Sequence, residues 1–186
     1  MVDANRALAY RFYAELWNKG NFAAANELLH PDHFDHNPPL PGLPQGREGV
    51  IQMISAFRDA FPDLEMSVDE IVAEGDRVAE RLTLRGTHNG TFQRIPPTGR
   101  RISVTSVNVC RIEDGLVRER WGNADDVALM EQLGLLPVRG SAAWKSTLAV
   151  AGLATRVRTN RKLRAGLALG AASLAAIVGV NLVRGR

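Results

Sequence analysis

Two residues near the end of the last strongly alternating segment, Trp121 and Asp125, have types that suit acid/base chemistry. If this segment is a strand, the indole and the carboxyl share a face, because residues an even number apart do so. An apolar neighbour raises the pKa of a carboxyl, which can then take a proton from a carbon flanked by carbonyls and later return one to an alkoxide. Asp125 is therefore the first catalytic candidate. The alternative is that Asp125 caps the following helix, although we expect Asp126 at that cap.

Two histidines, His36 and His88, could hydrogen-bond a substrate carbonyl or the enolate oxygen that forms from it. The alternative for each is a purely structural hydrogen-bonding role. His33 and His36 also have a spacing that resembles a metal site. The chain between Pro31 and Pro38 should be extended, however, and there an odd offset sends the two rings to opposite sides. We therefore expect no metal.

Polar residues within the alternating segments could bind a ligand. Arg81 and Asn108 would offer hydrogen-bond donors to an anionic or oxygen-rich molecule if their faces turn inward. The alternative for Arg81 is a solvated strand face on which it pairs with a Glu across the sheet. Cys110 is the only cysteine, so the chain can form no disulfide within itself, and we expect a packed thiol.

Helices in the first third of the chain must position part of this site. Apolar residues recur at spacings of three and four up to Lys19, and again from Gly46 to Phe61, which predicts two amphipathic helices. A shorter helix between them, capped by Asn21, ends before Pro31 because a residue preceding proline avoids the helical region. Two aromatic residues of these helices, Tyr13 and Phe57, are expected to contact the substrate.

The hydrophobic period changes to two after these helices. Four alternating segments rich in Val, Ile, Leu and Thr are separated by turn sequences, and they cover residues 64–73, 77–88, 101–113 and 116–124. They predict an antiparallel meander, which a short helix from Val127 to Leu133 follows. Helices followed by strands favour an α+β domain whose helices cover one face of a curved sheet.

Several motifs carry a resemblance to a known family. In chain order they are His36-Asn-Pro-Pro-Leu-Pro-Gly, Gly46-Arg-Glu-Gly, Gly86-Thr-His-Asn-Gly, Ile95-Pro-Pro-Thr-Gly-Arg, and Trp121-Gly-Asn-Ala-Asp ahead of Leu129-Met-Glu-Gln-Leu-Gly. Over about residues 5–137 the chain resembles the SnoaL-like polyketide or ester cyclases of the nuclear-transport-factor-2-like superfamily. The resemblance implies a cone-shaped α+β barrel that encloses a pocket.

The same resemblance implies a function. It makes Asp125 the general acid/base of a cofactor-independent, intramolecular aldol ring closure on a polyketide-like small molecule, with Trp121, His36 and His88 shaping the pocket. It also implies a homodimer formed through the convex face of the sheet. The alternatives are a double-bond isomerase or an epoxide hydrolase with the same pocket, and a non-catalytic module that binds small molecules.

The charge distribution divides the chain. All 20 acidic residues but only 14 of the 23 basic residues precede Val138, so residues 1–137 carry a net charge of −6 and the remainder +9. An acidic body with a basic tail is not the pattern of a nucleic-acid-binding domain. We expect a domain over residues 1–137, a basic linker or amphipathic segment over 138–164 and an apolar helix over 165–183.

The apolar segment 165–183 is a candidate membrane anchor. It has nineteen uncharged residues with basic residues on both sides, and as a helix it would extend about 28 Å, near the thickness of a hydrocarbon core. The alternative is a soluble or interfacial helix, because the segment is rich in Ala and Gly. The excess of positive charge before this segment, and a charged N-terminus unlike a signal peptide, predict a cytoplasmic domain.

Overall fold

The computed structural model describes the backbone of residues 2–159 and the side chains of residues 2–151. The chain divides into two units between Leu136 and Pro137. The first unit holds four α-helices, two short helical segments of other types and a five-stranded sheet. Helix α5 (Ala142–Thr159) belongs to the second unit.

The helices precede most of the sheet, as the hydrophobic period predicts. Helix α1 (Val2–Phe12) continues directly into a π-helical segment, η1 (Tyr13–Asn18), and a 3₁₀ segment, η2 (Phe22–Ala24), leads into α2 (Ala25–Leu28). Helix α3 (Gly46–Ala60) follows the proline-rich loop. Single π-helical turns within helices are frequent at functional sites, and here the π turn carries one of the predicted substrate-binding aromatics.

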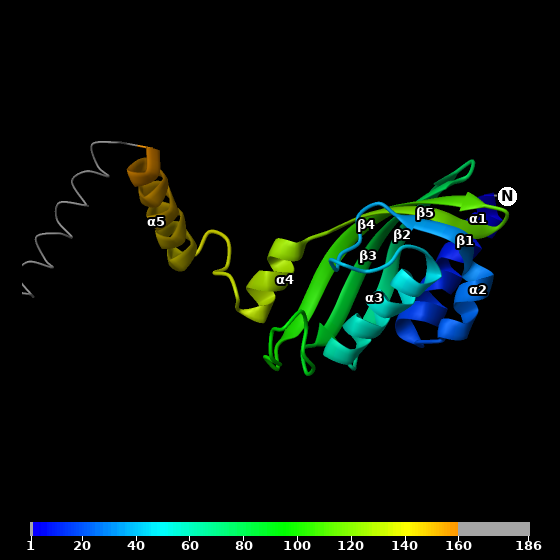
Figure 1. Ribbon diagram of the computed structural model, residues 1–186, viewed down its shortest axis with the longest axis horizontal. Coiled ribbons are helices and arrows are strands. Elements are labelled where there is room, and N and C mark those ends of the chain that lie inside the picture. The colour runs from blue at the N-terminus through cyan, green and yellow to red at the C-terminus, as the bar shows by residue number, and fades with distance from the viewer. Residues whose placement is uncertain (1, 160–186) are drawn as a thin grey trace, which may run out of the picture. The chain divides into compact units, whose positions relative to one another are not determined.

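The predicted antiparallel meander is confirmed. Its strands are β2 (Glu65–Glu74), β3 (Arg77–Thr87), β4 (Arg101–Glu113) and β5 (Leu116–Ala124). Each pairs antiparallel with the next along the chain. Helices α1, α2 and α3 lie on the same side of this sheet (Figure 1), so the α+β architecture expected from the sequence is present.

The meander is not the whole sheet, because a fifth strand was not predicted. Strand β1 (Leu29–Asp35) lies beside β5 and runs parallel to it, giving the order β1-β5-β4-β3-β2. The sheet is therefore mixed, where only the antiparallel meander was expected. The strand begins immediately after α2 and contains Pro31, which an edge strand tolerates because it needs no ladder hydrogen bond on its outer side.

Strand β5 contains one residue more than the stretch of β4 that it faces. Arg118 is opposite no residue, because its neighbours Val117 and Glu119 pair with consecutive residues of β4. Such a bulge shifts the alternation of side chains by one position. Val117 and Arg120 consequently lie on the same face of the sheet, and Trp121 lies on the other.

The core fills the space between the helices and one face of the sheet. Its most deeply buried side chains come from both layers, and they include Leu16, Leu28, Ile54, Phe61, Val78 and Leu82. The opposite face of the sheet exposes apolar side chains such as Val72 and Val107. Helix α4 (Asp126–Leu133) packs against β4 and ends at Gly134, which adopts the left-handed conformation with φ of 80°.

Within residues 2–159, no helix is both long enough and apolar enough to cross a membrane. The candidate anchor at 165–183 lies outside the residues that the structure describes.

We expect the substitution Gly49→Ala to destabilise the first unit. A Cβ atom at this position of α3 would lie 1.8 Å from the carbonyl oxygen of Pro44, so the proline-rich loop would have to move. Overpacking of this kind costs about 1–3 kcal/mol, which exceeds the gain of up to about 1 kcal/mol from replacing a helical glycine. Urea denaturation should show a lower midpoint. Gln52→Ala, at an exposed position of α3, is the control and should change the unfolding free energy by less than about 0.5 kcal/mol.

Candidate active site

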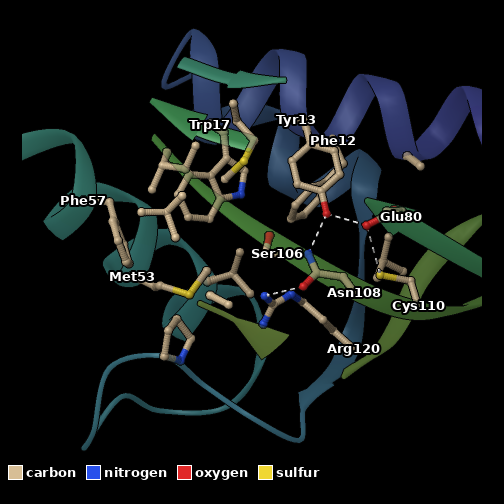
Figure 2. Close-up of a pocket in the computed structure, with 18 of the residues that line it drawn as sticks. Phe12, Tyr13, Trp17, Met53, Phe57, Glu80, Ser106, Asn108, Cys110 and Arg120 are labelled. Carbon is tan, nitrogen blue, oxygen red and sulfur yellow. Dashed lines mark hydrogen bonds between the residues drawn. The ribbon is translucent and has the colours of Figure 1, made fainter. Parts of the chain in front are cut away.

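A cavity lies between the helices and the inner face of the sheet. Most of its wall is apolar and comes from α1, η1, α3, β3 and β4, with lining residues that include Phe12, Trp17, Met53, Phe57, Leu84 and Val104 (Figure 2). A largely apolar cavity with a few converging polar groups is the usual form of a small-molecule site.

Five polar side chains form one continuous row across the inner side of the sheet, and all of them except Asp35 line the cavity. We use the term polar row for Asp35 of β1, Arg120 of β5, Asn108 of β4, Glu80 of β3 and Tyr13 of η1. The strand register brings the sheet residues together, because Glu80 is opposite Asn108 and Arg120 is opposite Asp35. Tyr13 reaches the row from the helical layer (Figure 2).

Hydrogen bonds connect every member of the polar row. The Arg120 guanidinium donates from Nη1 to Asp35 Oδ2 at 2.8 Å and from Nη2 to Asn108 Oδ1 at 3.1 Å. Asn108 Nδ2 donates to the Tyr13 hydroxyl oxygen at 3.0 Å, and the Tyr13 hydroxyl donates to Glu80 Oε2. From Arg120 through Asn108 and Tyr13, each side chain donates a hydrogen bond to the next one. The Glu80 carboxyl is the final acceptor of this series.

Burial dominates the electrostatics of the row. It raises the pKa of Glu80 to about 7, although the hydrogen bond from Tyr13 and the positive charge of Arg120 both act to lower it. It also raises the pKa values of Tyr13 and Cys110 well above their ordinary values, so both keep their protons. For Arg120 burial acts to lower the pKa, but the nearby Asp35 carboxylate reverses this and the pKa is raised. Glu80 is thus the member of the row whose charge changes near neutral pH.

Three of the predicted substrate-binding residues line the cavity. They are Tyr13, Phe57 and Asn108. Asn108 is only 2% exposed, and its amide makes the two hydrogen bonds described above. The inward orientation of Asn108 follows from regular alternation in β4, which the sequence indicates correctly.

Trp121 and His36 lie on the outer side of the sheet and do not line the cavity. Their rings stack with centroids 4.3 Å apart, and His36 Nε2 is 2.8 Å from Glu119 Oε2. The expectation that Trp121 shares the inner face is wrong, because the bulge at Arg118 reverses the alternation between Val117 and Trp121.

Arg81 and His88 also lie away from the cavity. Arg81 is on the outer face of β3, where it forms ion pairs with Asp69 at 3.1 Å and Glu70 at 3.3 Å, as the solvated-face alternative describes. His88 is fully buried near the turn that precedes β4, with its Nδ1 3.1 Å from the Thr98 hydroxyl. Burial lowers the pKa of His88 and favours the neutral ring.

Asp125 is the cap of α4 and is not one of the residues that line the cavity. Its Oδ1 accepts a hydrogen bond from the backbone N–H of Ala128 at 2.9 Å, so Asp125 and not Asp126 is the N-cap. The residues on either side of it, Ala124 and Asp126, line the cavity. The structure therefore gives Asp125 a capping role beside two residues of the cavity wall.

The histidines considered as metal ligands point to opposite faces of the sheet. His33 is buried and lines the cavity, with its Nδ1 3.0 Å from the carbonyl oxygen of Val117, whereas His36 lies outside. Among the described residues, His30, Glu113 and Asp114 bring potential ligand atoms within 4.8 Å of one another. Glu113 of this group already pairs with two arginine side chains, and none of the group lines the cavity.

Comparison with known proteins identifies the family. The family model for SnoaL-like polyketide cyclases matches residues 7–133. The chain belongs to this family. The SnoaL-like chain is 31% identical over 120 residues to the nogalonic acid methyl ester cyclase of Streptomyces nogalater, an alignment that covers 63% of this chain and 89% of that enzyme. It is also 31% identical over 131 residues to the aklanonic acid methyl ester cyclase DnrD of Streptomyces peucetius. This alignment covers 67% of this chain and 87% of DnrD.

Solved structures agree with this assignment. TsrD from Streptomyces laurentii is 33% identical with a TM-score of 0.66, and the match covers 72% of this chain and 97% of TsrD. IdmH from Streptomyces antibioticus is 36% identical with a TM-score of 0.62, and the match covers 70% of this chain and 98% of IdmH. The SnoaL-like fold expected from the motifs is therefore confirmed.

Three members of the polar row, Asp35, Glu80 and Arg120, were not predicted from the sequence. A signal for Glu80 was available, because it occupies an inward position between Val78 and Leu82, where strand alternation calls for an apolar residue. No comparable signal marks Arg120, because strict alternation in β5 assigns it to the outer face.

The raised pKa of Glu80 predicts a specific pH dependence of stability. The folded protein holds this proton up to a pH of about 7, whereas the unfolded chain releases it near the ordinary value of 4.5. Between these values the folded state binds more protons, so the unfolding free energy falls as pH rises and levels off above the folded pKa. Wild type should lose about 3 kcal/mol relative to Glu80→Gln between pH 4 and pH 8.

Urea denaturation at several pH values measures this difference. Glu70→Gln, an exposed substitution on the outer face, is the control and should follow the wild-type curve. Parallel curves for wild type and Glu80→Gln would contradict the burial of a titrating carboxyl in the cavity.

Proposed function

We propose that the chain is a polyketide cyclase that closes a ring by an intramolecular aldol reaction without a cofactor. The observation that carries the proposal is an apolar cavity with converging acid/base groups in a member of the SnoaL-like family. Two relatives are named as cyclases of nogalonic and aklanonic acid methyl esters, so we propose a polycyclic ketoester as the substrate class.

The reaction needs one proton removed and one supplied. A base takes the proton from a carbon between two carbonyls, and the enolate that results attacks a second carbonyl within the same molecule. A new carbon–carbon bond forms, and the attacked oxygen becomes an alkoxide that must be protonated. The hydrogen on a carbon between carbonyls is acidic enough for a carboxylate base.

We propose Asp125 as this base. The support is its position beside two cavity-lining residues and the match of Trp121-Gly-Asn-Ala-Asp125 to the family pattern. In this proposal Trp121 supports β5 from the outer face and does not desolvate the carboxyl. His36 and His88 keep the structural hydrogen-bonding roles described above, because neither lines the cavity.

The substitution Asp125→Asn should separate catalysis from binding. Asparagine caps helices as well as aspartate does, so the fold should remain, but an amide cannot accept the proton. With the aklanonic and nogalonic acid methyl esters as substrates, we expect kcat to fall at least about 100-fold while ligand affinity changes by less than about threefold.

Asp126→Asn is the matched control, because Asp126 is the adjacent carboxylate, lines the same cavity and does not cap α4. It should retain most of the turnover. Full turnover in Asp125→Asn would exclude Asp125 as the base. Ligand binding without turnover in the wild type would favour the non-catalytic binding module.

We propose that the segment 165–183 holds the protein at a membrane with the cyclase domain on the cytoplasmic side. The support is a run of nineteen uncharged residues with basic residues before and after it.

The homodimer implied by the family resemblance also stays a proposal, and the exposed Val72 and Val107 of the outer sheet face would suit such an interface.

Fractionation of expressing cells tests the anchor. Full-length protein should sediment with membranes, and a version that ends at Val138 should stay in the supernatant. Leu174→Asp, which keeps every basic residue but places a charge near the middle of the segment, should also move protein to the supernatant if the segment spans the bilayer. Equal recovery of all three proteins in the supernatant would contradict membrane attachment.

A further inference from the structure

We propose that Tyr13 and Glu80 act together as the proton donor of the cavity, binding the carbonyl oxygen that the reaction attacks and protonating the alkoxide that forms. In this arrangement Asn108 and Arg120 are positioning residues, and the ligand is any apolar ring system with a carbonyl oxygen at the polar end of the cavity. The catalytic part of the inference rests on the cyclase function proposed above.

The argument starts from the direction of the hydrogen bonds. Arginine can only donate, so its bond to Asn108 fixes the amide oxygen toward Arg120. The amide nitrogen of Asn108 must then face Tyr13, where it donates at 3.0 Å. Asn108 therefore cannot accept the hydrogen of the Tyr13 hydroxyl, and that hydrogen has only two other directions, toward Glu80 or into the cavity.

The protonation state of Glu80 decides between these two directions. An ionised carboxylate only accepts, so it holds the Tyr13 hydrogen. A protonated Glu80 can donate to the Tyr13 oxygen instead, which frees the Tyr13 hydrogen for a ligand. Both side chains line the cavity, and Figure 2 shows the Tyr13 hydroxyl pointing from the helical layer toward the sheet residues of the polar row.

The surroundings of Glu80 allow both states at physiological pH. The titratable or charged groups that face it are Tyr13 from η1, Cys110 from β4 and Arg120 from β5, while the residue paired with it on β2, Ile71, is apolar. Arg120 is already paired with Asp35, so its charge is largely balanced before it acts on Glu80. A carboxyl in such a site can stay neutral near pH 7 and donate a hydrogen bond.

The proton and electron balance of the proposed step is complete. Asp125 takes the proton from the substrate carbon, and the electron pair left behind forms the new carbon–carbon bond. The π electrons of the attacked carbonyl move to its oxygen, which takes the Tyr13 proton while the Glu80 proton passes to Tyr13. The step ends with Asp125 protonated and Glu80 ionised, and exchange with solvent restores both.

Binding of a matched pair of probes tests the donor without requiring turnover. The probes are 9-fluorenone and fluorene, which have almost the same shape and differ by a carbonyl oxygen. Wild type should prefer fluorenone about threefold to tenfold at pH 5.5. This preference should disappear by pH 8.5 with a midpoint near the pKa of Glu80, which is about 7. Desolvation of Glu80 by the ring system acts on both probes alike, so it cancels in this preference.

Two substitutions distinguish the proposed role from a structural one. Tyr13→Phe removes the donor and should abolish the fluorenone preference at every pH. Glu80→Gln cannot ionise and can donate to Tyr13, so it should retain the preference at pH 8.5, where wild type loses it. Glu70→Gln on the outer face is the control and should behave as wild type. Unfolding midpoints at pH 5.5 verify that each variant is folded.

The outcomes separate this inference from the proposed function. A fluorenone preference that is absent in wild type, or that persists in Tyr13→Phe, would overturn the donor pair whatever the enzyme does with ketoesters. A donor pair that behaves as expected in a protein with no cyclase turnover would contradict the proposed function alone. If the donor pair and the cyclase function are both correct, Tyr13→Phe should lower kcat on the ketoester substrate about 100-fold.

Discussion

The buried guanidinium of Arg120 is the charge around which the inner face of the sheet is organised. A cation taken out of water must be paired, and here the pairing carboxylate belongs to Asp35, on a strand that no hairpin connects to β5. The ion pair therefore contributes to holding β1 parallel to β5, which completes the sheet on the side opposite β2. Removing Asp35 would leave an unpaired guanidinium in the cavity wall, and removing Arg120 would leave a buried carboxylate without its ion pair, so the fold and the site depend on the same contact.

The position of Arg120 depends in turn on one extra residue. Without the bulge at Arg118, alternation would continue from Val117 to Glu119 and Trp121, and a carboxylate and an indole would face the cavity in place of the guanidinium. The bulge moves Glu119 and Trp121 to the outer face, where they contact His36. One inserted residue thus determines both the charge of the cavity and the composition of the outer face.

These details explain how far the sequence could predict the site. The helices and the four meander strands follow from hydrophobic period, and the inward positions of Tyr13, Phe57 and Asn108 follow from regular geometry. The orientation of Trp121 could not be predicted, because a bulge changes the phase of a strand without a marker in the sequence. Strand β1 was missed for a related reason, since Pro31 and its polar neighbours hide the alternation of a short edge strand.

The apolar wall of the cavity has two effects that cannot be separated. It offers contact area to an apolar ring system, and it withdraws water from Glu80, which is why the pKa of that carboxyl is near 7. A ring system that fills the cavity displaces more water and favours the neutral carboxyl further. Ligand binding and protonation of Glu80 therefore reinforce each other, so the donor state of Tyr13 is most populated when a carbonyl is present to accept its hydrogen.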